Sequence, residues 1–342
     1  MAFVAGGITL KHVRLVDLAK ETGLSVNAVS RALRDMPDIG SETKSRIKEV
    51  ASRLGYSANL AASMIRTNRS DTVGVIVTDI SNPVFGSMVK GIDTYAKEYG
   101  YTIILSDTNE NYADEEKTIE KMIERRVDGF LLVPSMQNDK TIVRLIERKI
   151  PFVLLGRHFS NISTNYVSSD DVFGGYLAGR HLLDKGHREF IYITGPLYIS
   201  SANDRLEGFQ QALTEAGMSK DSIKVYETES SFQGGYDVVN SLAAGNKVPK
   251  SIFCFNDFIA YGAYKALHEN QIRIPQDVAV IGYDDRGFSE IVSPALTTID
   301  MSKHNVGRRA MEMLINEIKK PADENSRKQM IMQPVLVIRE ST

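Results

Sequence analysis

Carboxylate, amide and guanidinium side chains recur at the ends of apolar runs in this 342-residue chain. Carboxylates accept hydrogen bonds, guanidinium groups donate them and amides do both, so such a set can satisfy adjacent hydroxyl groups in pairs, as in a sugar. A single acidic residue in such a place more often belongs to a solvated loop, so only the whole set is informative. These ends are Asp79 to Phe85, Gly156-Arg157, Ser169-Asp170, Asn256-Asp257 and Tyr283-Asp284-Asp285.

Apolar runs that alternate with helical segments predict the elements that must position these side chains. The runs are continuously apolar, which is typical of strands buried on both faces of a parallel sheet. Two series of runs predict two doubly wound lobes, and ligands bind such sheets at the carboxyl ends of the strands. The runs are 73–77, 103–105, 129–133 and 152–155 in the first series and 190–193, 223–226, 252–255 and 278–281 in the second.

The N-terminal part of the chain differs from the rest in charge. Residues 1–70 contain eleven Lys or Arg and six Asp or Glu, which gives +5, whereas the remaining residues sum to −7. A positive end on an acidic body suits a chain that meets a polyanion at that end. Taken alone the signal is weak, because many solvated helical segments are mildly basic.

Residues 14–55 predict three short helices. The first ends at Gly23, and Ser25 is a suitable N-cap for a second helix from about Val26 to Arg34. The third runs from near Gly40 to the next glycine, residue 55. Because only a few residues join the first two helices, their spacing is that of a helix-turn-helix.

The second of these helices has one polar and one apolar face when residues are projected at about 100° each. Arginine can bond guanine and asparagine can bond adenine in the major groove, while serine can hold a phosphate. An ordinary amphipathic helix with a solvated polar face remains the alternative at this point. The polar face consists of Asn27, Ser30, Arg31 and Arg34.

The run from Leu15 to Leu33 resembles the DNA-binding headpiece of LacI/GalR-family bacterial repressors, and Ser41 to Tyr56 is similar to the third helix of that family. The similarity continues to Val335–Ser341 and leaves out only the first dozen residues. The resemblance implies a homodimeric transcription repressor that binds a palindromic operator and responds to a small effector. It also implies an α/β fold in which a helix-turn-helix headpiece precedes a two-lobed body like a periplasmic binding protein.

The residues that would contact DNA follow from this resemblance. Val26 and Asn27, after the N-cap Ser25, would read bases, and Ser30 and Arg31 would support them together with Arg34. Alanine stands at position 28, where many members of the family have threonine.

Residues 58–71 correspond to the hinge of the family. The stretch 59–65 is too short to be helical by itself, since isolated helices need roughly 12–15 residues. The resemblance implies a hinge helix that pairs with its dimer mate in the minor groove, where Ala62 would contact DNA and Ile65 would be the wedge between base pairs. The family usually has leucine at the wedge and often arginine where Ser63 stands. A plain interdomain linker is the alternative.

The effector would lie between the two lobes, where Arg205, Asp284 and Asn256 would bond hydroxyl groups. Arg157 and Asp170 would contribute from the other rim. The aromatic rings of Phe85 and Phe232 would cover the apolar faces of the effector. A mono- or oligosaccharide suits this chemistry, and a nucleobase or nucleoside fits the same architecture. The implied effector-binding residues are Phe85, Arg157, Asp170, Arg205, Phe232, Asn256 and Asp284.

These assignments divide the chain into an N-terminal extension, a headpiece, a hinge and an effector-binding and dimerisation domain. In the last, one lobe takes about 72–169 and 301–330, and the other about 170–300 and 331–342. The four parts are 1–13, 14–57, 58–71 and 72–342.

Other classes of protein find less support. The sequence contains no Gly-x-Gly-x-x-Gly after a strand, no phosphate-binding loop and no Gly-x-Ser-x-Gly, so we expect no cofactor and no enzyme, although a sugar-processing enzyme is a rival. The single cysteine, Cys254, excludes a disulfide framework, and the paired aspartates lack a nearby histidine, so we expect no metal.

A solute-binding protein is the second rival, but it would need export and has no use for a basic helical head. The apolar stretch at residues 3–10 has no basic residue before it and makes a poor secretory signal. No run approaches the roughly 18 apolar residues of a membrane span. We therefore expect a cytoplasmic protein without a membrane partner.

Overall fold

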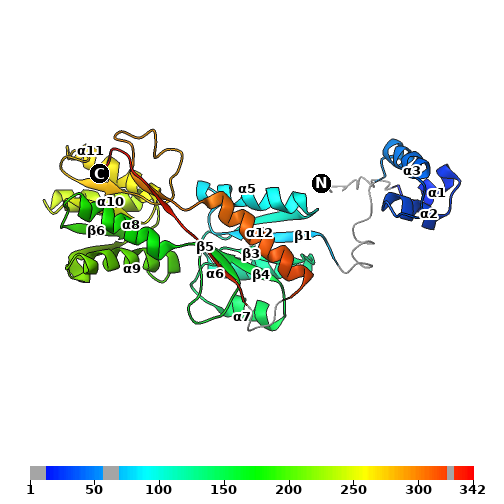
Figure 1. Ribbon diagram of the computed structural model, residues 1–342, viewed down its shortest axis with the longest axis horizontal. Coiled ribbons are helices and arrows are strands. Elements are labelled where there is room, and N and C mark those ends of the chain that lie inside the picture. Colours follow the sequence, from blue (N-terminus) through cyan, green and yellow to red (C-terminus); the bar gives the residue numbers. More distant parts are fainter. Residues whose placement is uncertain (1–12, 57–68, 322–326) are drawn as a thin grey trace, which may run out of the picture. The chain divides into compact units, whose positions relative to one another are not determined.

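The computed structural model describes residues 13–56, 69–321 and 327–342. The chain divides into two compact units, the head Met1–Ser70 and the body Asp71–Thr342 (Figure 1). Of the helices in the described ranges, none is long and apolar enough to cross a membrane.

The head consists of the three predicted helices, α1 (Leu15–Thr22), α2 (Val26–Leu33) and α3 (Ser41–Leu54). Ser25 is the N-cap of α2, where its Oγ accepts a hydrogen bond from Ala28 N at 3.2 Å. Gly23 ends α1 with a φ of 70°, a left-handed conformation that glycine adopts without steric cost. Leu18, Val29 and Ile47, one from each helix, are fully buried and form a small apolar core.

Lobe 1 of the body is built on a sheet of six parallel strands in the order β11-β5-β4-β3-β1-β2. Strand β11, which no apolar run in the sequence predicts, extends the sheet beside β5 and contains the expected lobe boundary between residues 330 and 331. The strands are β1 (Thr72–Val77), β2 (Thr102–Asp107), β3 (Gly129–Leu132), β4 (Phe152–Leu155), β5 (Tyr166–Ser169) and β11 (Gln329–Met332).

Lobe 2 has a sheet of four parallel strands in the order β7-β6-β8-β9. Two further strands, β10 (Thr298–Asp300) and β12 (Val335–Val337), pair antiparallel with each other. The chain passes between the lobes three times, after β5, after β10 and after β11, and so forms the three crossings that a hinge needs. The strands of the four-stranded sheet are β6 (Phe190–Thr194), β7 (Ile223–Glu227), β8 (Ser251–Cys254) and β9 (Ala279–Ile281).

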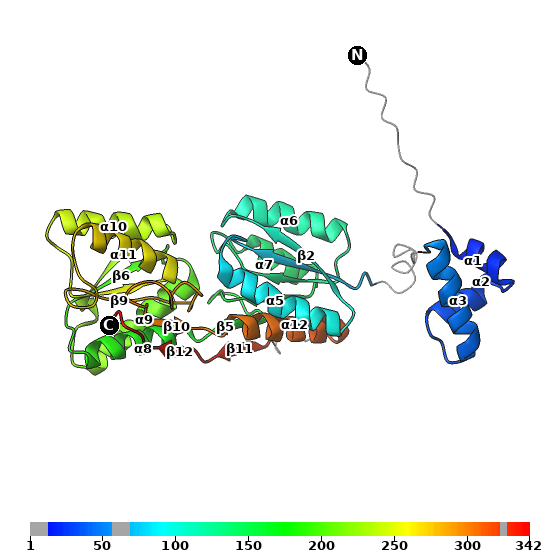
Figure 2. The same ribbon diagram turned by 90° about the horizontal axis from the view of Figure 1, so that it is seen from above.

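Helices cover both sheets, as Figures 1 and 2 show. The doubly wound α/β architecture predicted from the apolar runs is therefore confirmed. Lobe 1 carries α5 (Pro83–Glu98), α6 (Tyr112–Glu124), α7 (Lys140–Glu147) and α12 (Lys303–Lys319). Lobe 2 carries α8 (Asp171–Asp184), α9 (Ser200–Glu215), the short 3₁₀ turn η1 (Lys220–Ser222), α10 (Phe232–Ala244) and α11 (Asp257–Glu269).

Two glycines bring α5 and α12 into direct backbone contact in lobe 1, where the helices lie side by side in both views (Figures 1 and 2). A Cβ added at Gly91 of α5 would lie 2.1 Å from His304 O, and one added at Gly307 of α12 would lie 2.0 Å from Met88 O. No side chain fits at such distances, so both positions require glycine. This reciprocal contact joins α5, which begins at the cleft, to α12, which follows the crossing after β10.

Candidate functional site

A cleft of about 240 Å³ lies between the lobes, at the carboxyl ends of their strands. Its polar lining comes from loops and helix starts that follow those strands, as the sequence predicts. Lobe 1 contributes Asp79, Asn82, Phe85, Glu110 and Arg157. Lobe 2 contributes Ser201, Arg205, Ser230, Asn256, Asp284 and Arg286.

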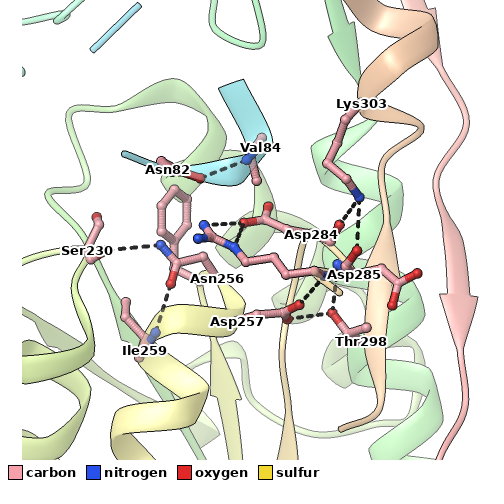
Figure 3. Close-up of polar contacts among 12 residues, drawn as sticks. Asn82, Val84, Ser230, Asn256, Asp257, Ile259, Asp284, Asp285, Thr298 and Lys303 are labelled. Carbon is pink, nitrogen blue, oxygen red and sulfur yellow. Dashed lines mark hydrogen bonds and ion pairs between the residues drawn. The ribbon is translucent and has the colours of Figure 1, made fainter. Parts of the chain in front are cut away.

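Two asparagines of the cleft are also helix N-caps, which fixes their side chains. Asn82 Oδ1 accepts from Val84 N at 3.0 Å at the start of α5, and Phe85 follows in the first turn of that helix. Asn256 Oδ1 accepts from Ile259 N at 2.9 Å at the start of α11, while its Nδ2 donates to Ser230 O at 3.1 Å. Figure 3 shows Asn82 and Asn256 on facing elements of the two lobes.

Arg157 is held within lobe 1 by a bidentate ion pair. Its Nη1 and Nη2 donate to the two carboxylate oxygens of Glu110 at 2.8 and 2.6 Å, and Nη1 also donates to Pro134 O at 2.7 Å. The Arg157 side chain is 9% exposed, whereas that of Glu110 is 40% exposed. The pair therefore presents a neutralised charge at the edge of the cleft.

Arg205 forms a deeply buried ion pair within lobe 2. Its Nε donates to Asp171 Oδ1 at 2.8 Å and its Nη1 to Phe255 O at 2.5 Å. The guanidinium also lies over the Tyr283 ring, 3.4 Å from the centroid. Burial raises the pKa of Asp171, and the charge of Arg205 opposes that rise. Arg205 lies in the second turn of α9.

Asp284 belongs to a loop whose backbone is strained and strongly held. Asp284 and Asp285 have φ values of 107° and 50°, which are rare for residues with a side chain. Lys303, the first residue of α12, donates from Nζ to Asp284 O and, at 3.1 Å, to Asp285 O (Figure 3). Arg286 donates to Asp284 Oδ2 from Nε at 3.2 Å and from Nη2 at 2.9 Å. A lobe 1 helix thus helps to fix the loop that presents Asp284.

Asp257 supports the same loop from below and is itself fully buried. Its carboxylate accepts from Arg286 N at 2.8 Å, Ser289 Oγ at 2.6 Å and Thr298 Oγ1 at 2.7 Å. Burial raises the pKa of Asp257 to about 6, with the charge of Asp284 adding to the rise and these hydrogen bonds opposing it. Figure 3 shows Asp257 between Thr298 and the loop that carries Asp284 and Asp285.

The lobes also touch at one rim of the cleft. His158 N of lobe 1 donates to Ser200 Oγ of lobe 2 at 3.0 Å, and Ser200 N contacts Met136 Sδ at 3.3 Å. The His158 ring lies 3.8 Å from Asp204 Oδ2, measured from Nδ1. Burial lowers the pKa of His158 and raises that of Asp204 to about 7.

Most of the predicted effector-binding residues come together in this cleft. The lining includes Phe85, Arg157, Arg205, Asn256 and Asp284. It does not include two others. Asp170 is the N-cap of α8, where its Oδ1 accepts from Phe173 N at 2.9 Å, and Phe232 is 39% exposed at the start of α10.

Sequence reasoning missed three charged residues of the site. Glu110 follows β2 and could have been found by its place after a strand. Asp171 was passed over in favour of its neighbour, because the sequence does not say which aspartate caps α8 and which meets Arg205. Arg286 gave no signal, since it lies in a loop beyond the Asp-Asp pair.

On α2 of the head, the residues predicted to read bases are accessible. Val26 is 41% exposed, and Ser25, Asn27 and Arg34 are also exposed. Ser30 is half-buried and its carbonyl accepts from Arg34 Nε at 3.0 Å.

Arg31, also on α2, is half-buried and already engaged within the head. Its Nε donates to Asp38 Oδ2 at 2.7 Å, and its Nη2 lies 2.6 Å from Asp38 Oδ1. The hydrogen bond from Arg31 lowers the pKa of Asp38. The other predicted DNA contacts, Ala62 and Ile65, lie outside the described residues.

Comparison with known protein families places both units. Residues 14–59 match the family described as bacterial regulatory proteins, lacI family, and residues 70–340 match periplasmic binding proteins and sugar binding domain of LacI family. The chain belongs to the LacI family. It is a DNA-binding transcriptional repressor of this family, with a helix-turn-helix head and a ligand-binding body.

Named relatives of the LacI family align along nearly the whole chain. The ribose operon repressor of Haemophilus influenzae is 32% identical over 325 residues, which cover 95% of this chain and 97% of the relative. The HTH-type transcriptional repressor PurR of Pasteurella multocida is 32% identical with the same coverage. These relatives are transcriptional repressors.

Solved structures of LacI-family proteins agree with the fold. A LacI family regulator from Enterococcus faecium with bound ribose is 30% identical, with a TM-score of 0.72, and covers 79% of this chain and 98% of that one. The lac repressor dimer bound to operator and an anti-inducer has a TM-score of 0.87 and covers 97% and 99%. At 23% identity the second likeness shows the fold alone.

Proposed function

We propose that this chain represses a carbohydrate-utilisation operon and that a neutral monosaccharide, bound between the lobes, controls its affinity for the operator. The charge balance of the cleft supports a neutral ligand. Each of the three arginines among the described lining residues is bound by a carboxylate of its own lobe. The pairs are Arg157 with Glu110, Arg205 with Asp171, and Arg286 with Asp284.

An anionic ligand would meet no guanidinium without a carboxylate partner in such a cleft. A phosphate or carboxylate gains most from a guanidinium fork that is free to bind it in a bidentate way. Here a carboxylate already neutralises each guanidinium, and breaking a buried pair would leave a charge uncompensated. Hydroxyl groups can instead bond to the remaining N–H groups and oxygens without separating any pair.

The size and the apolar walls of the cleft favour a single sugar ring. Its volume of about 240 Å³ is below the roughly 300–1,000 Å³ typical of pockets for drug-sized ligands. Phe85 from lobe 1 and Phe255 from lobe 2 both line it and offer ring faces to the C–H surface of a sugar. The relatives named as ribose operon repressors and the structure with bound ribose support the same class of ligand.

Two of the cleft carboxylates favour a role in binding over a role in hydrolysis. Hydrolysis of a glycosidic bond needs two carboxyl groups that are free to donate and accept protons on either side of the sugar. Glu110 and Asp284 both line the cleft, but an arginine occupies each of them.

On the DNA side we propose a homodimer in which Ser25, Val26, Asn27, Ser30, Arg31 and Arg34 of α2 contact a palindromic operator. Segment 58–71, with Ala62 and Ile65, would pair with its dimer mate in the minor groove. Sugar binding closes the lobes and changes the separation of the two segments, so sugar and DNA affinities are coupled reciprocally. Binding to an operator on the chromosome would require the protein to be in the cytoplasm.

Selection of DNA by the full-length protein tests the whole proposal. Duplexes that bind would be selected from a random pool, and their affinity measured by fluorescence anisotropy with ribose, glucose, cellobiose, hypoxanthine or guanine present. We expect a palindromic consensus and one sugar that changes its affinity at least about tenfold. An effect of the nucleobases alone would reassign the effector class, and the absence of any consensus would contradict operator binding.

A further inference from the structure

Arg286 has an environment that an ordinary structural ion pair does not explain. The residue is 3% exposed, and two of its guanidinium nitrogens, Nε and Nη2, donate to the same oxygen of Asp284, Oδ2. The third nitrogen, Nη1, is buried and has no hydrogen-bond partner among the described residues. Arg286 is also one of the residues that line the cleft.

The other two arginines of the cleft differ in this respect. Nη1 of Arg157 donates to both Glu110 and Pro134 O, and Nη1 of Arg205 donates to Phe255 O. Among guanidinium nitrogens in the described ranges, only Arg286 Nη1 is buried without a partner. Leaving a buried charged donor without an acceptor costs free energy, so such a group is expected to have an acceptor in the functional state.

The surroundings of Arg286 hold its guanidinium in one place. One face lies over the Phe258 ring, 3.8 Å from the centroid, and the backbone N donates to Asp257 at 2.8 Å. The ring on one face and the two hydrogen bonds to Asp284 together fix the plane of the guanidinium and therefore the direction of Nη1.

Asp284 supplies the complement to this donor. The bonds from Arg286 fall on Oδ2, and Oδ1 receives none from the described residues. An unoccupied carboxylate oxygen accepts a hydrogen bond, and the neighbouring Nη1 donates one. Two adjacent hydroxyl groups fit this arrangement, because one can donate to Asp284 while the next accepts from Arg286.

We propose that Arg286 is a specificity-determining residue that, together with Asp284, recognises a pair of adjacent hydroxyl groups on the effector. This inference rests on the proposed function, since it assigns a role within the same cleft. It adds a residue that the family resemblance did not supply. It also narrows the ligand to a polyol with hydroxyl groups on neighbouring carbons.

Calorimetry with deoxy sugars separates recognition from support of the fold. The full-length wild type and Arg286→Lys would be titrated with D-ribose and D-glucose, and then with each mono-deoxy derivative of the sugar that binds. In the wild type we expect one derivative to bind about 10- to 100-fold more weakly than its parent. In Arg286→Lys, which keeps the charge but lacks Nη1, that ratio should fall to nearly one. Arg273→Lys is the control, because Arg273 is exposed and pairs with Asp277.

The outcomes distinguish this assignment from the proposed function. If Arg286 only supported the loop, parent and derivative would weaken together and every ratio would stay at its wild-type value, which overturns the assignment alone. If the wild type bound neither sugar, the sugar effector itself would be contradicted and the assignment with it.

A crystal structure of the wild type with the bound sugar tests the same point even if the variant does not fold. Nη1 within about 3.2 Å of a sugar oxygen supports the assignment. Nη1 bonded only to water, or to no atom, overturns it.

Discussion

Arg205 and Asp171 are joined by a hydrogen bond of 2.8 Å between Nε and Oδ1, and each side chain is 4% exposed. Asp171 is the first residue of α8 and Arg205 lies in α9, so the ion pair ties these two helices together below the cleft. The same guanidinium lines the cleft. Arg205 therefore both lines the cleft and joins two helices of lobe 2, so the effects of its variants on ligand binding and on stability must be measured separately.

Removal of one member of this pair should destabilise the protein strongly. Arg205→Met leaves Asp171 buried without its partner, which costs about 3–5 kcal/mol for a buried pair. The double variant Arg205→Met, Asp171→Leu should be less destabilised than Arg205→Met, because no uncompensated charge remains. Urea unfolding followed by circular dichroism measures both. If the double variant lost at least as much stability as Arg205→Met, the unpaired charge of Asp171 would not be the cause of the destabilisation.

Release of Arg157 should change the charge class of the ligand. In Glu110→Gln the guanidinium loses its bidentate carboxylate and is free to bind an anion. We expect ribose 5-phosphate to bind at least about tenfold more tightly than it binds the wild type, since charge-assisted bonds are the stronger kind. Calorimetry with ribose and ribose 5-phosphate checks this. Glu120→Gln, which removes the same charge from a surface pair with Arg144, should change neither affinity.

The buried carboxyl of Asp257 should make the body less stable as the pH rises. Its folded pKa of about 6 lies above the unfolded value of about 3.9, so the folded protein holds this proton more tightly. The stabilisation is complete below about pH 4 and is lost as the pH rises through about 6, in total about 3 kcal/mol.

Urea unfolding between pH 4 and 7 tests this dependence. Asp257→Asn should make the curve less steep over that interval, because the contribution of this carboxyl has been removed. Asp237→Asn, at an exposed position of α10, should keep the wild-type slope. An unchanged slope in Asp257→Asn would mean that the loss of stability has another origin.

In the head, two neighbouring residues should separate stability from base recognition. Ser25→Ala removes the acceptor of the Ala28 N–H bond, which typically costs about 1 kcal/mol of helix stability. Asn27→Ala, at an exposed position, should leave the melting temperature unchanged but weaken discrimination of the operator by about 1–3 kcal/mol. Thermal melts and anisotropy with operator and random duplexes measure the two effects. If Asn27→Ala weakened the affinity for the operator and for the random duplex equally, Asn27 would not contact a base.

The sequence predicted those features that depend on local pattern. Continuous apolar runs predicted all the strands of the two sheets except β5 and β11, because burial on both faces leaves little room for polar residues. Ser25 and Gly23 predicted helix ends, since capping depends on the residue and its immediate neighbours. Residues that follow strands, such as Asn256 and Asp284, could be predicted to meet in the cleft, because topology brings strand ends together.

Features that depend on distant partners could not be predicted in the same way. Arg286 lies against Phe258, which is 28 positions earlier in the chain, and sequence spacing gives no sign of that contact. Strand β11 is short, and two of its four residues are exposed, so its apolar pattern is weak. The choice between Asp170 and Asp171 depended on which carboxylate faces α9, and that follows only from the packing of two helices.

The reciprocal contact of Gly91 and Gly307 makes α5 and α12 one rigid unit. With backbone atoms in direct contact and no side chains between them, neither helix can slide without displacing the other. At the cleft, Asn82 and Phe85 lie at the start of α5. Helix α12 begins at Lys303, which donates a hydrogen bond to the backbone of Asp284. A movement of the cleft residues that displaces one of these helices therefore displaces the other as well. A bulkier residue at either glycine would force the two helices apart.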